Sequence, residues 1–178
     1  MVVVSPGYAG HELATAQHHD LTIYNMDMGY AAPVCLGLAL ARPDQRVVAM
    51  EGDGSLLMGV GCLTTIARYA PPNLTLLVFD NGQYLTTGRG AVPTATSHGA
   101  DLALLARGAG FMDEQVCVVD DLADFEATVA RALSEAGPWC VVAQVDTSDR
   151  GAPRARGDFP LDLVEQAVVF QIRLRQRV

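Results

Sequence analysis

The sequence predicts an α/β fold, an open parallel β-sheet with helices on both faces. Short, continuous apolar runs of strand length recur along the chain, and such runs are typical of parallel strands, which are buried on both faces. Segments with helical character separate these runs, and that alternation is typical of a parallel α/β sheet. A length of 178 residues suits one hydrophobic core, so we expect a single domain over residues 1–178.

The segment up to Pro43 is predicted to contain two short strands and two helices. Val2–Val4 is expected to be a buried strand, and the turn-forming residues after it lead into a helix over His11–His18. Thr22–Tyr24 is expected to be a second short strand. The stretch MGYAAPVCLGLALARP carries small and apolar residues on every side, as expected of a helix that is buried all round, and Pro43 ends it.

The middle of the chain is predicted to supply the centre of the sheet. Arg46–Met50 is an apolar strand of the parallel-sheet type, and a helix over roughly Met58–Tyr69 follows it and ends before two prolines. Leu74–Phe79 is the next buried strand. One helix separates the two strands, so we expect them to be parallel and their carboxyl ends to lie side by side.

The rest of the chain continues the alternation and closes with a helix. A helix, a strand, a second helix and a second strand are predicted at Asp101–Arg107, Val116–Val119, Asp120–Ala136 and Trp139–Val145. Residues 146–178 are expected to form a polar connection rich in Gly, Pro and Arg (Asp146–Pro160) and a closing amphipathic helix (Leu161–Arg175).

Composition excludes several function classes. The net charge of −8 disfavours binding to nucleic acid and to anionic membranes. All twelve basic residues are arginines, so the lysine chemistry of Schiff bases and P-loops is excluded. No apolar run approaches the ~20 residues that span a bilayer, and no signal peptide is recognisable, so we expect a cytoplasmic protein. The four cysteines lie far apart, without a C-x-x-C pair, and are expected to be reduced core residues.

Polar residues at the ends of two neighbouring strands give the strongest functional signal. Gly52-Asp53-Gly54-Ser55 follows Arg46–Met50, and Asp80-Asn81-Gly82-Gln83 follows Leu74–Phe79. Carboxylate, amide and main-chain oxygens are hard ligands that suit Mg²⁺, which usually shares phosphate oxygens. The N–H groups of Gly54 and Ser55 and the Ser55 hydroxyl begin a helix and can meet a phosphate at its positive end. These residues predict a metal–diphosphate site.

The spacing of these two motifs resembles the signature of thiamine diphosphate enzymes, in which Gly-Asp-Gly is followed by an Asn-containing turn. The resemblance implies the thiamine diphosphate-binding fold, with thiamine diphosphate and Mg²⁺ as cofactors. It makes Asp53 and Asn81 side-chain ligands of the metal and Gln83 a ligand through its main-chain carbonyl. Gly52, Gly54 and Ser55 would then contact the cofactor, with Tyr84 at the edge of the site.

The resemblance extends upstream of the metal motif. Met28 precedes a glycine 25 positions before Asp53, where the family places a bulky residue that wedges between the two cofactor rings and keeps the cofactor bent. The bent form brings the pyrimidine amino nitrogen close to the reacting carbon of the thiazolium ring. The Met26 carbonyl would accept a hydrogen bond from that amino group. The opening stretch SPGYAGHEL resembles the family's diphosphate loop near Gly7–Gly10, although a hydroxyl residue often stands at the position of Ala9.

The resemblance also implies a partner and a reaction. Full-length members have a pyrimidine-binding domain whose glutamate activates the cofactor, and neither Glu12 nor Glu51 matches that role. The catalytic residue of this chain is therefore unknown. We expect a separate pyrimidine-binding (alpha) subunit to complete the site in a hetero-oligomer.

Within the family, the chain resembles sulfopyruvate decarboxylase β subunits and the C-terminal part of phosphonopyruvate decarboxylases. This implies a lyase that releases CO₂ and an aldehyde from a small, anionic 2-oxo acid. Arg89, with Thr86 and Thr87 beside it, is the candidate for binding the anionic tail of the substrate.

Other interpretations remain open. Gly-Asp-Gly alone can be a tight turn, and Met28 alone can be a core residue. A nicotinamide-binding Rossmann turn would need a third glycine where Leu57 stands. An acetolactate-synthase-like carboligase subunit, or a non-catalytic thiamine diphosphate-binding module, would share the same motifs. The histidines at positions 11, 18, 19 and 98 are expected to be solvated rather than catalytic, and Cys62 lacks an adjacent base.

Overall fold

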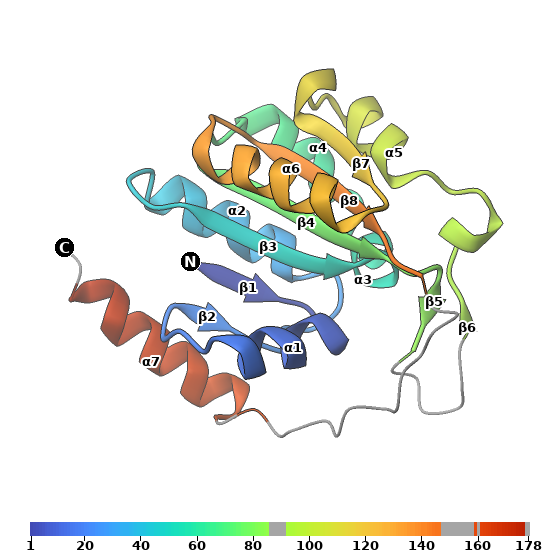
Figure 1. Ribbon diagram of the computed structural model, residues 1–178. Helices are drawn as coiled ribbons and strands as arrows, with labels where there is room; N and C mark the ends of the chain where they lie inside the picture. The colour runs from blue at the N-terminus through green and yellow to red at the C-terminus, as the bar shows by residue number, and fades with distance from the viewer. Residues whose placement is uncertain (86–91, 147–158, 160, 177–178) are drawn as a thin grey trace.

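The computed structural model describes residues 1–85, 92–146, 159 and 161–176, and a six-stranded β-sheet organises it (Figure 1). All neighbouring strands are parallel, in the order β2-β1-β3-β4-β8-β7. In chain order they are β1 Val2–Val4, β2 Thr22–Ile23, β3 Val47–Gly52, β4 Leu74–Asp80, β7 Val116–Val119 and β8 Trp139–Gln144. The predicted fold class is confirmed.

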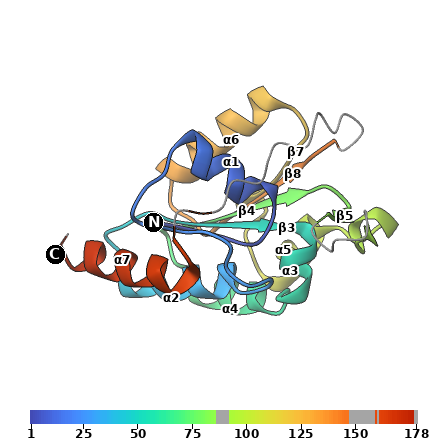
Figure 2. The same cartoon turned by 90° about the horizontal axis from the view of Figure 1, so that it is seen from below.

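Helices cover both faces of this sheet. They are α1 Tyr8–Ala16, α2 Ala31–Ala41, α3 Asp53–Met58, α4 Cys62–Tyr69, α5 Leu102–Ala109, α6 Leu122–Ser134 and α7 Leu163–Arg175, with short 3₁₀ helices η1 Thr96–His98 and η2 Asp113–Gln115. Figure 2 shows α1 and α6 on one face of the sheet and α2, α4 and α7 on the other. The larger apolar core lies between the sheet and α2, α4, α5 and α7, and a smaller core lies under α6.

The two central strands end at the same edge of the sheet, as the sequence predicts. β3 and β4 pair in parallel, and their register places Gly52 opposite Phe79. Asp53, the first residue of α3, and Asp80, the last residue of β4, therefore lie at the same level of the sheet edge. Beyond β4 the chain forms a small antiparallel hairpin of β5 Gln83–Tyr84 and β6 Val92–Pro93.

The predicted helix Met58–Tyr69 is wrong at its start, because the structure forms two helices, α3 and α4, with a break at Gly59. A Cβ atom at Gly59 would lie 2.5 Å from the carbonyl oxygen of Gly29 and 3.0 Å from its Cα atom. Such a close approach of two backbones requires glycine. The break therefore lets the end of α3 pack directly on the loop that precedes α2.

The first helix also differs from its predicted span, since α1 runs from Tyr8 to Ala16 rather than over His11–His18. Gly7 has a φ angle of 147°, which residues with a side chain rarely adopt. The chain consequently turns at this one glycine, and the helix starts directly after it.

Helix α7 covers the outer edge of the sheet at β2. The buried side chain of Gln166 accepts a hydrogen bond from the Tyr24 N–H at 2.6 Å and donates one to the Leu161 carbonyl at 2.8 Å. Because this side chain takes the Tyr24 N–H, β2 ends at Ile23, one residue earlier than predicted. Phe170, also buried, adds apolar contact to the larger core.

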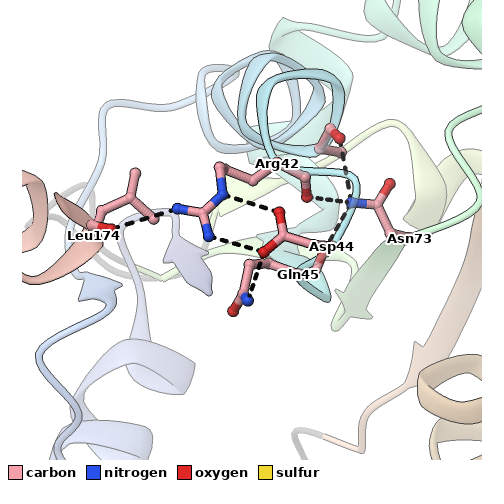
Figure 3. A network of polar contacts seen from close by, with 6 residues as sticks. Arg42, Asp44, Gln45, Asn73 and Leu174 are labelled. Carbon is pink, nitrogen blue, oxygen red and sulfur yellow. Dashed lines mark hydrogen bonds and ion pairs between the residues drawn. The ribbon is translucent and has the colours of Figure 1, made fainter. Parts of the chain in front are cut away.

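Polar contacts connect the turn after α2 to its surroundings (Figure 3). The Arg42 guanidinium bonds to both carboxylate oxygens of Asp44, at 2.9 and 2.8 Å, and donates to the Leu174 carbonyl of α7 at 3.4 Å. The Asn73 amide donates to the carbonyls of Arg42 and Gln45 at 3.0 and 2.8 Å. The turn between α2 and β3 is thereby tied both to α7 and to the start of β4.

The cysteines and the membrane prediction can also be compared with the structure. All four cysteines are free thiols. Cys35 and Cys140 are buried, as expected of core residues, whereas Cys62 and Cys117 are only partly buried. Among the described residues, we find no helix that combines the length and the apolar character needed to cross a membrane.

Candidate functional site

A cavity of about 570 Å³ lies at the carboxyl ends of β1, β3 and β4. Its wall contains every predicted cofactor-binding residue except Met26: Met28, Gly52, Asp53, Gly54, Ser55, Asn81, Gln83 and Tyr84. The N-terminal segment and α1 complete the wall, with Gly7, Tyr8 and Ala9 among the lining residues. Motifs that are far apart in sequence thus share one cavity, as expected where parallel strands end.

Met26 and one residue of the predicted diphosphate loop, Gly10, are not part of the cavity wall. The Met26 N–H donates to the Val4 carbonyl at 2.9 Å, and the Met26 side chain packs against the larger core. Gly10, the last residue of the predicted diphosphate loop, is buried against Val4 and Phe159, and a Cβ atom at this position would lie 3.4 Å from the Val4 side chain. The cavity wall therefore contains Gly7, Tyr8 and Ala9 of that loop, but not Gly10.

Asp53 is the first residue of α3 and is almost fully buried. Its Oδ2 atom accepts hydrogen bonds from the hydroxyls of Thr94, at 2.5 Å, and Thr96, at 3.1 Å. Thr96 Oγ1 also lies 2.7 Å from Asp80 Oδ1, so its one hydroxyl proton can go to only one of the two carboxylates at a time. Sequence reasoning missed both threonines, because the hairpin that carries them returns to Asp53 only in three dimensions.

The turn after β4 holds Asn81 and Gln83 in a defined local geometry. Asn81 Oδ1 accepts a hydrogen bond from the Gln83 N–H at 2.9 Å, and the Gly82 N–H donates to Asp80 Oδ1 at 3.1 Å. Gly82 has a φ angle of 67°, which favours glycine. An amide oxygen has two lone pairs, so Asn81 Oδ1 keeps acceptor capacity for a metal ion.

A buried carboxylate, Glu51, connects three segments beneath the cavity. Glu51 Oε1 accepts the Ala32 N–H at 2.9 Å, and Oε2 accepts the Ser55 hydroxyl. Ser55 Oγ in turn accepts the Gly29 N–H at 3.0 Å. Burial raises the pKa of Glu51, and hydrogen bonds from Ser55, Ala32 and Ser5 oppose that rise. The Ser55 hydroxyl has one proton and gives it to Glu51. The hydrogen bond that the sequence predicts between this hydroxyl and a phosphate has not been tested and stays a prediction.

The two glycines of the Gly-Asp-Gly motif meet different surroundings. A Cβ atom at Gly54 would lie 2.6 Å from Tyr84 Cδ1 and still closer to Cε1, so the Tyr84 ring would have to move to admit a side chain there. A Cβ atom at Gly52 would meet nothing within 4 Å, although Gly52 lines the cavity. A bound group can therefore approach the backbone at Gly52, which is the close approach that a diphosphate needs.

The charge of the cavity wall restricts what can bind there. The lining residues include the carboxyl groups of Glu12, Glu51 and Asp53 and, within the described part of the chain, no Arg, Lys or His. The described residues also contain no cluster of three or more His, Cys, Asp or Glu that could hold a metal on its own. A metal ion at Asp53 would need further oxygen donors, such as Asn81, a main-chain carbonyl or a phosphate. The residues present thus fit a metal and a diphosphate that bind together.

Other candidate residues lie outside this cavity or outside the described residues. His11 stacks on Phe159 with ring centroids 4.4 Å apart, and His18 lies at the surface beside Asp20. His98 is an exposed residue of η1. Arg89, Thr86 and Thr87, the predicted substrate-binding residues, fall outside the described residues.

The fold is that of a thiamine diphosphate-binding α/β domain. Residues 9–143 match the family model "Thiamine pyrophosphate enzyme, C-terminal TPP binding domain", and the chain belongs to this family. The proteins similar to it include decarboxylases, which are lyases, and, at lower identity, acetolactate synthase large subunits.

Three comparisons define this relationship. Phosphonopyruvate decarboxylase of Streptomyces viridochromogenes is 40% identical over 142 residues, which cover 79% of this chain and 34% of that protein. Sulfopyruvate decarboxylase subunit beta of Methanocaldococcus jannaschii is 33% identical over 136 residues, 76% of this chain and 69% of that one. A crystal structure from Mycobacterium smegmatis, of a protein described as thiamin diphosphate-dependent, shares the fold with a TM-score of 0.65 at 24% identity, over 80% of this chain and 28% of that one. The chain spans about a third of the length of the phosphonopyruvate decarboxylases that it matches.

Proposed function

We propose that this chain is the diphosphate-binding, beta-type subunit of a thiamine diphosphate- and Mg²⁺-dependent decarboxylase that acts on a small, anionic 2-oxo acid. The observation that carries the proposal is the single cavity that gathers Met28, Asp53 and Asn81. Relatives with the names phosphonopyruvate decarboxylase and sulfopyruvate decarboxylase support the reaction class and the anionic substrate.

The charge of the cavity supports the requirement for a metal. A diphosphate carries several negative charges, and the wall adds carboxyl groups without a basic residue among those described. At 4 Å, two like charges repel by about 4 kcal/mol at an effective dielectric constant of 20. A divalent cation between the diphosphate and Asp53 converts this repulsion into attraction. We therefore assign the Mg²⁺ ligands to the side chains of Asp53 and Asn81 and the main-chain oxygen of Gln83.

The other cavity residues have roles in holding the cofactor. Gly52, Gly54 and Ser55 offer backbone groups to the diphosphate, Met28 supports the bend between the two rings, and Met26 offers its carbonyl. Tyr84 closes the edge of the site beside Gly54. The bound cofactor would supply an electron sink for the loss of CO₂ from the substrate.

The activating glutamate is assigned to a separate pyrimidine-binding subunit. Of the two glutamates in the cavity wall, Glu51 is committed to Ala32 and Ser55, and Glu12 lies on α1. The M. jannaschii relative is itself a beta subunit. We expect no decarboxylation by the purified chain alone and turnover of sulfopyruvate or phosphonopyruvate after addition of the partner subunit. Turnover by the chain alone would refute the assignment of the glutamate to a partner.

Calorimetry on the chain tests the metal assignment separately from activity. Thiamine diphosphate should bind in the presence of Mg²⁺ and should not bind measurably in EDTA. Asp53→Asn removes a charged ligand and should weaken the Mg²⁺-dependent binding by at least about tenfold. A matched change at the exposed side chain of Asp113 in η2, Asp113→Asn, should leave it unaltered. Binding that is equally strong in EDTA would contradict the assignment.

A further inference from the structure

The hydroxyl of Thr94 lies against the carboxylate of Asp53 and is almost fully buried. The hairpin of β5 and β6 brings it there: the Thr94 N–H donates to the Gly82 carbonyl at 2.9 Å, directly after β6. Thr94 Oγ1 then lies 2.5 Å from Asp53 Oδ2, a short, charge-assisted hydrogen bond. A second turn of the chain thus contacts the predicted metal ligand from outside the Gly-Asp-Gly motif.

A count of protons identifies Thr94 as the hydrogen-bond donor to Asp53. Each threonine hydroxyl has one proton to give. Thr96 Oγ1 lies 2.7 Å from Asp80 Oδ1 and 3.1 Å from Asp53 Oδ2, so its shorter bond goes to Asp80. Thr94 Oγ1 also lies 2.9 Å from Thr96 Oγ1, a contact in which either oxygen could be the donor. Asp53 is the only carboxylate that Thr94 contacts among the described residues, and at 2.5 Å it is the nearer acceptor, so we assign the Thr94 proton to Asp53. Both hydroxyls contact Oδ2, and no hydrogen bond of the described residues reaches Oδ1.

We propose that Thr94 is a positioning residue of the metal site, which rests on the function proposed above. Its hydroxyl fixes the rotation of the Asp53 carboxylate by holding Oδ2, so that Oδ1 is left for the ion. Mg²⁺ demands near-octahedral geometry, and a carboxylate that rotates freely fits that geometry poorly. Loss of such an outer-shell hydrogen bond typically weakens metal affinity by about 10–100-fold.

The test compares two substitutions that differ by the hydroxyl. Thr94→Val removes the donor at similar volume, whereas Thr94→Ser keeps it. Mn²⁺ serves as the probe, and its affinity is measured by electron paramagnetic resonance on the full chain in the presence of thiamine diphosphate. We expect the affinity to fall about 10–100-fold in Thr94→Val. Thr94→Ser should remain within about threefold of wild type. Thr94→Ala gives the same comparison if the valine variant does not fold.

Thr75→Val is the matched control. Thr75 is also a buried threonine, and its hydroxyl donates to the Ala132 carbonyl at 3.1 Å, at the end of β4 opposite the cavity. This variant should lose stability and keep the wild-type affinity for Mn²⁺.

The possible outcomes separate the two proposals. If wild type binds Mn²⁺ with thiamine diphosphate and Thr94→Val binds it equally well, the role of Thr94 is overturned and the proposed function stands. If Thr94→Ser is as weak as Thr94→Val, the hydroxyl is not responsible and the role is likewise overturned. If wild type itself binds no Mn²⁺ with thiamine diphosphate, the proposed function fails and the role of Thr94 fails with it.

Discussion

The contact between Gly54 and Tyr84 makes a prediction about stability that does not depend on any ligand. Gly54→Ala would place a Cβ atom 2.6 Å from Tyr84 Cδ1 and closer still to Cε1. Carbon atoms pack at about 3.5–4.0 Å, so the ring would have to retreat by at least about 0.9 Å. Tyr84 belongs to β5, so this movement would disturb the hairpin that also carries Gln83.

The expected cost follows from the size of this overlap. Overpacking of this kind destabilises proteins by about 1–3 kcal/mol. For a domain of this length, 1 kcal/mol shifts the melting temperature by roughly 2–4 °C. We therefore expect Gly54→Ala to lower Tm by about 2–12 °C in a thermal unfolding experiment.

Gly37→Ala provides the matched control, because Gly37 lies in the interior of α2 and a Cβ atom there would meet nothing within 4 Å. Alanine is the better helix former by about 0.5–1 kcal/mol, so this variant should be more stable than wild type. In a Tyr84→Ala background, the cost of Gly54→Ala should largely disappear. An equal cost with and without the Tyr84 ring would refute the explanation.

Three further predictions concern other parts of the described structure. Because burial raises the pKa of Glu51, the folded state favours its protonated form, and this contribution to the free energy of unfolding is lost as the pH rises above the usual range for Glu. In urea titrations, the free energy of unfolding of the wild type should decline as the pH rises from about 4.5 to 8, and the decline should be smaller in Glu51→Gln. An equal pH dependence of the free energy of unfolding in the two proteins would count against this account. Gln166→Ala leaves the buried Tyr24 N–H without its acceptor and should lower the free energy of unfolding by about 1–3 kcal/mol in chemical denaturation. Gln176→Ala, at the exposed end of α7, is the control and should lower it by under about 0.5 kcal/mol. Similar losses in the two variants would contradict the role of Gln166. Burial raises the pKa of Cys62 to about 11 and that of Cys140 to about 12, so iodoacetamide at pH 8 should alkylate neither thiol in the native chain and both after unfolding, as read by peptide mass spectrometry. Rapid labelling of native Cys140 would contradict its burial in the folded chain.

The central strands could be predicted because their signal is local. β3 and β4 are continuous apolar runs, and the polar residues that follow them mark the sheet edge. The same locality explains why the two strand ends could be expected to lie side by side, since Asp53 and Asn81 directly follow paired strands and line one cavity. Met28 required the spacing of a family motif, because an isolated methionine has no distinguishing pattern.

The features that sequence reasoning missed depend on contacts between distant segments. The break at Gly59 exists because its backbone packs on Gly29, and no helix propensity encodes that contact. Thr94 reaches Asp53 only through the hairpin after β4. Gln166 ends β2 from a helix far along the chain. In each case the deciding partner lies outside the window that a local pattern can cover.

A crystal structure of the chain grown with Mg²⁺ and thiamine diphosphate tests the central claim most directly. We predict that the ion is bound by Asp53, Asn81 and the main-chain oxygen of Gln83, with the diphosphate in the cavity beside Gly52. A diphosphate bound elsewhere, or an ion that contacts neither Asp53 nor Asn81, would contradict it.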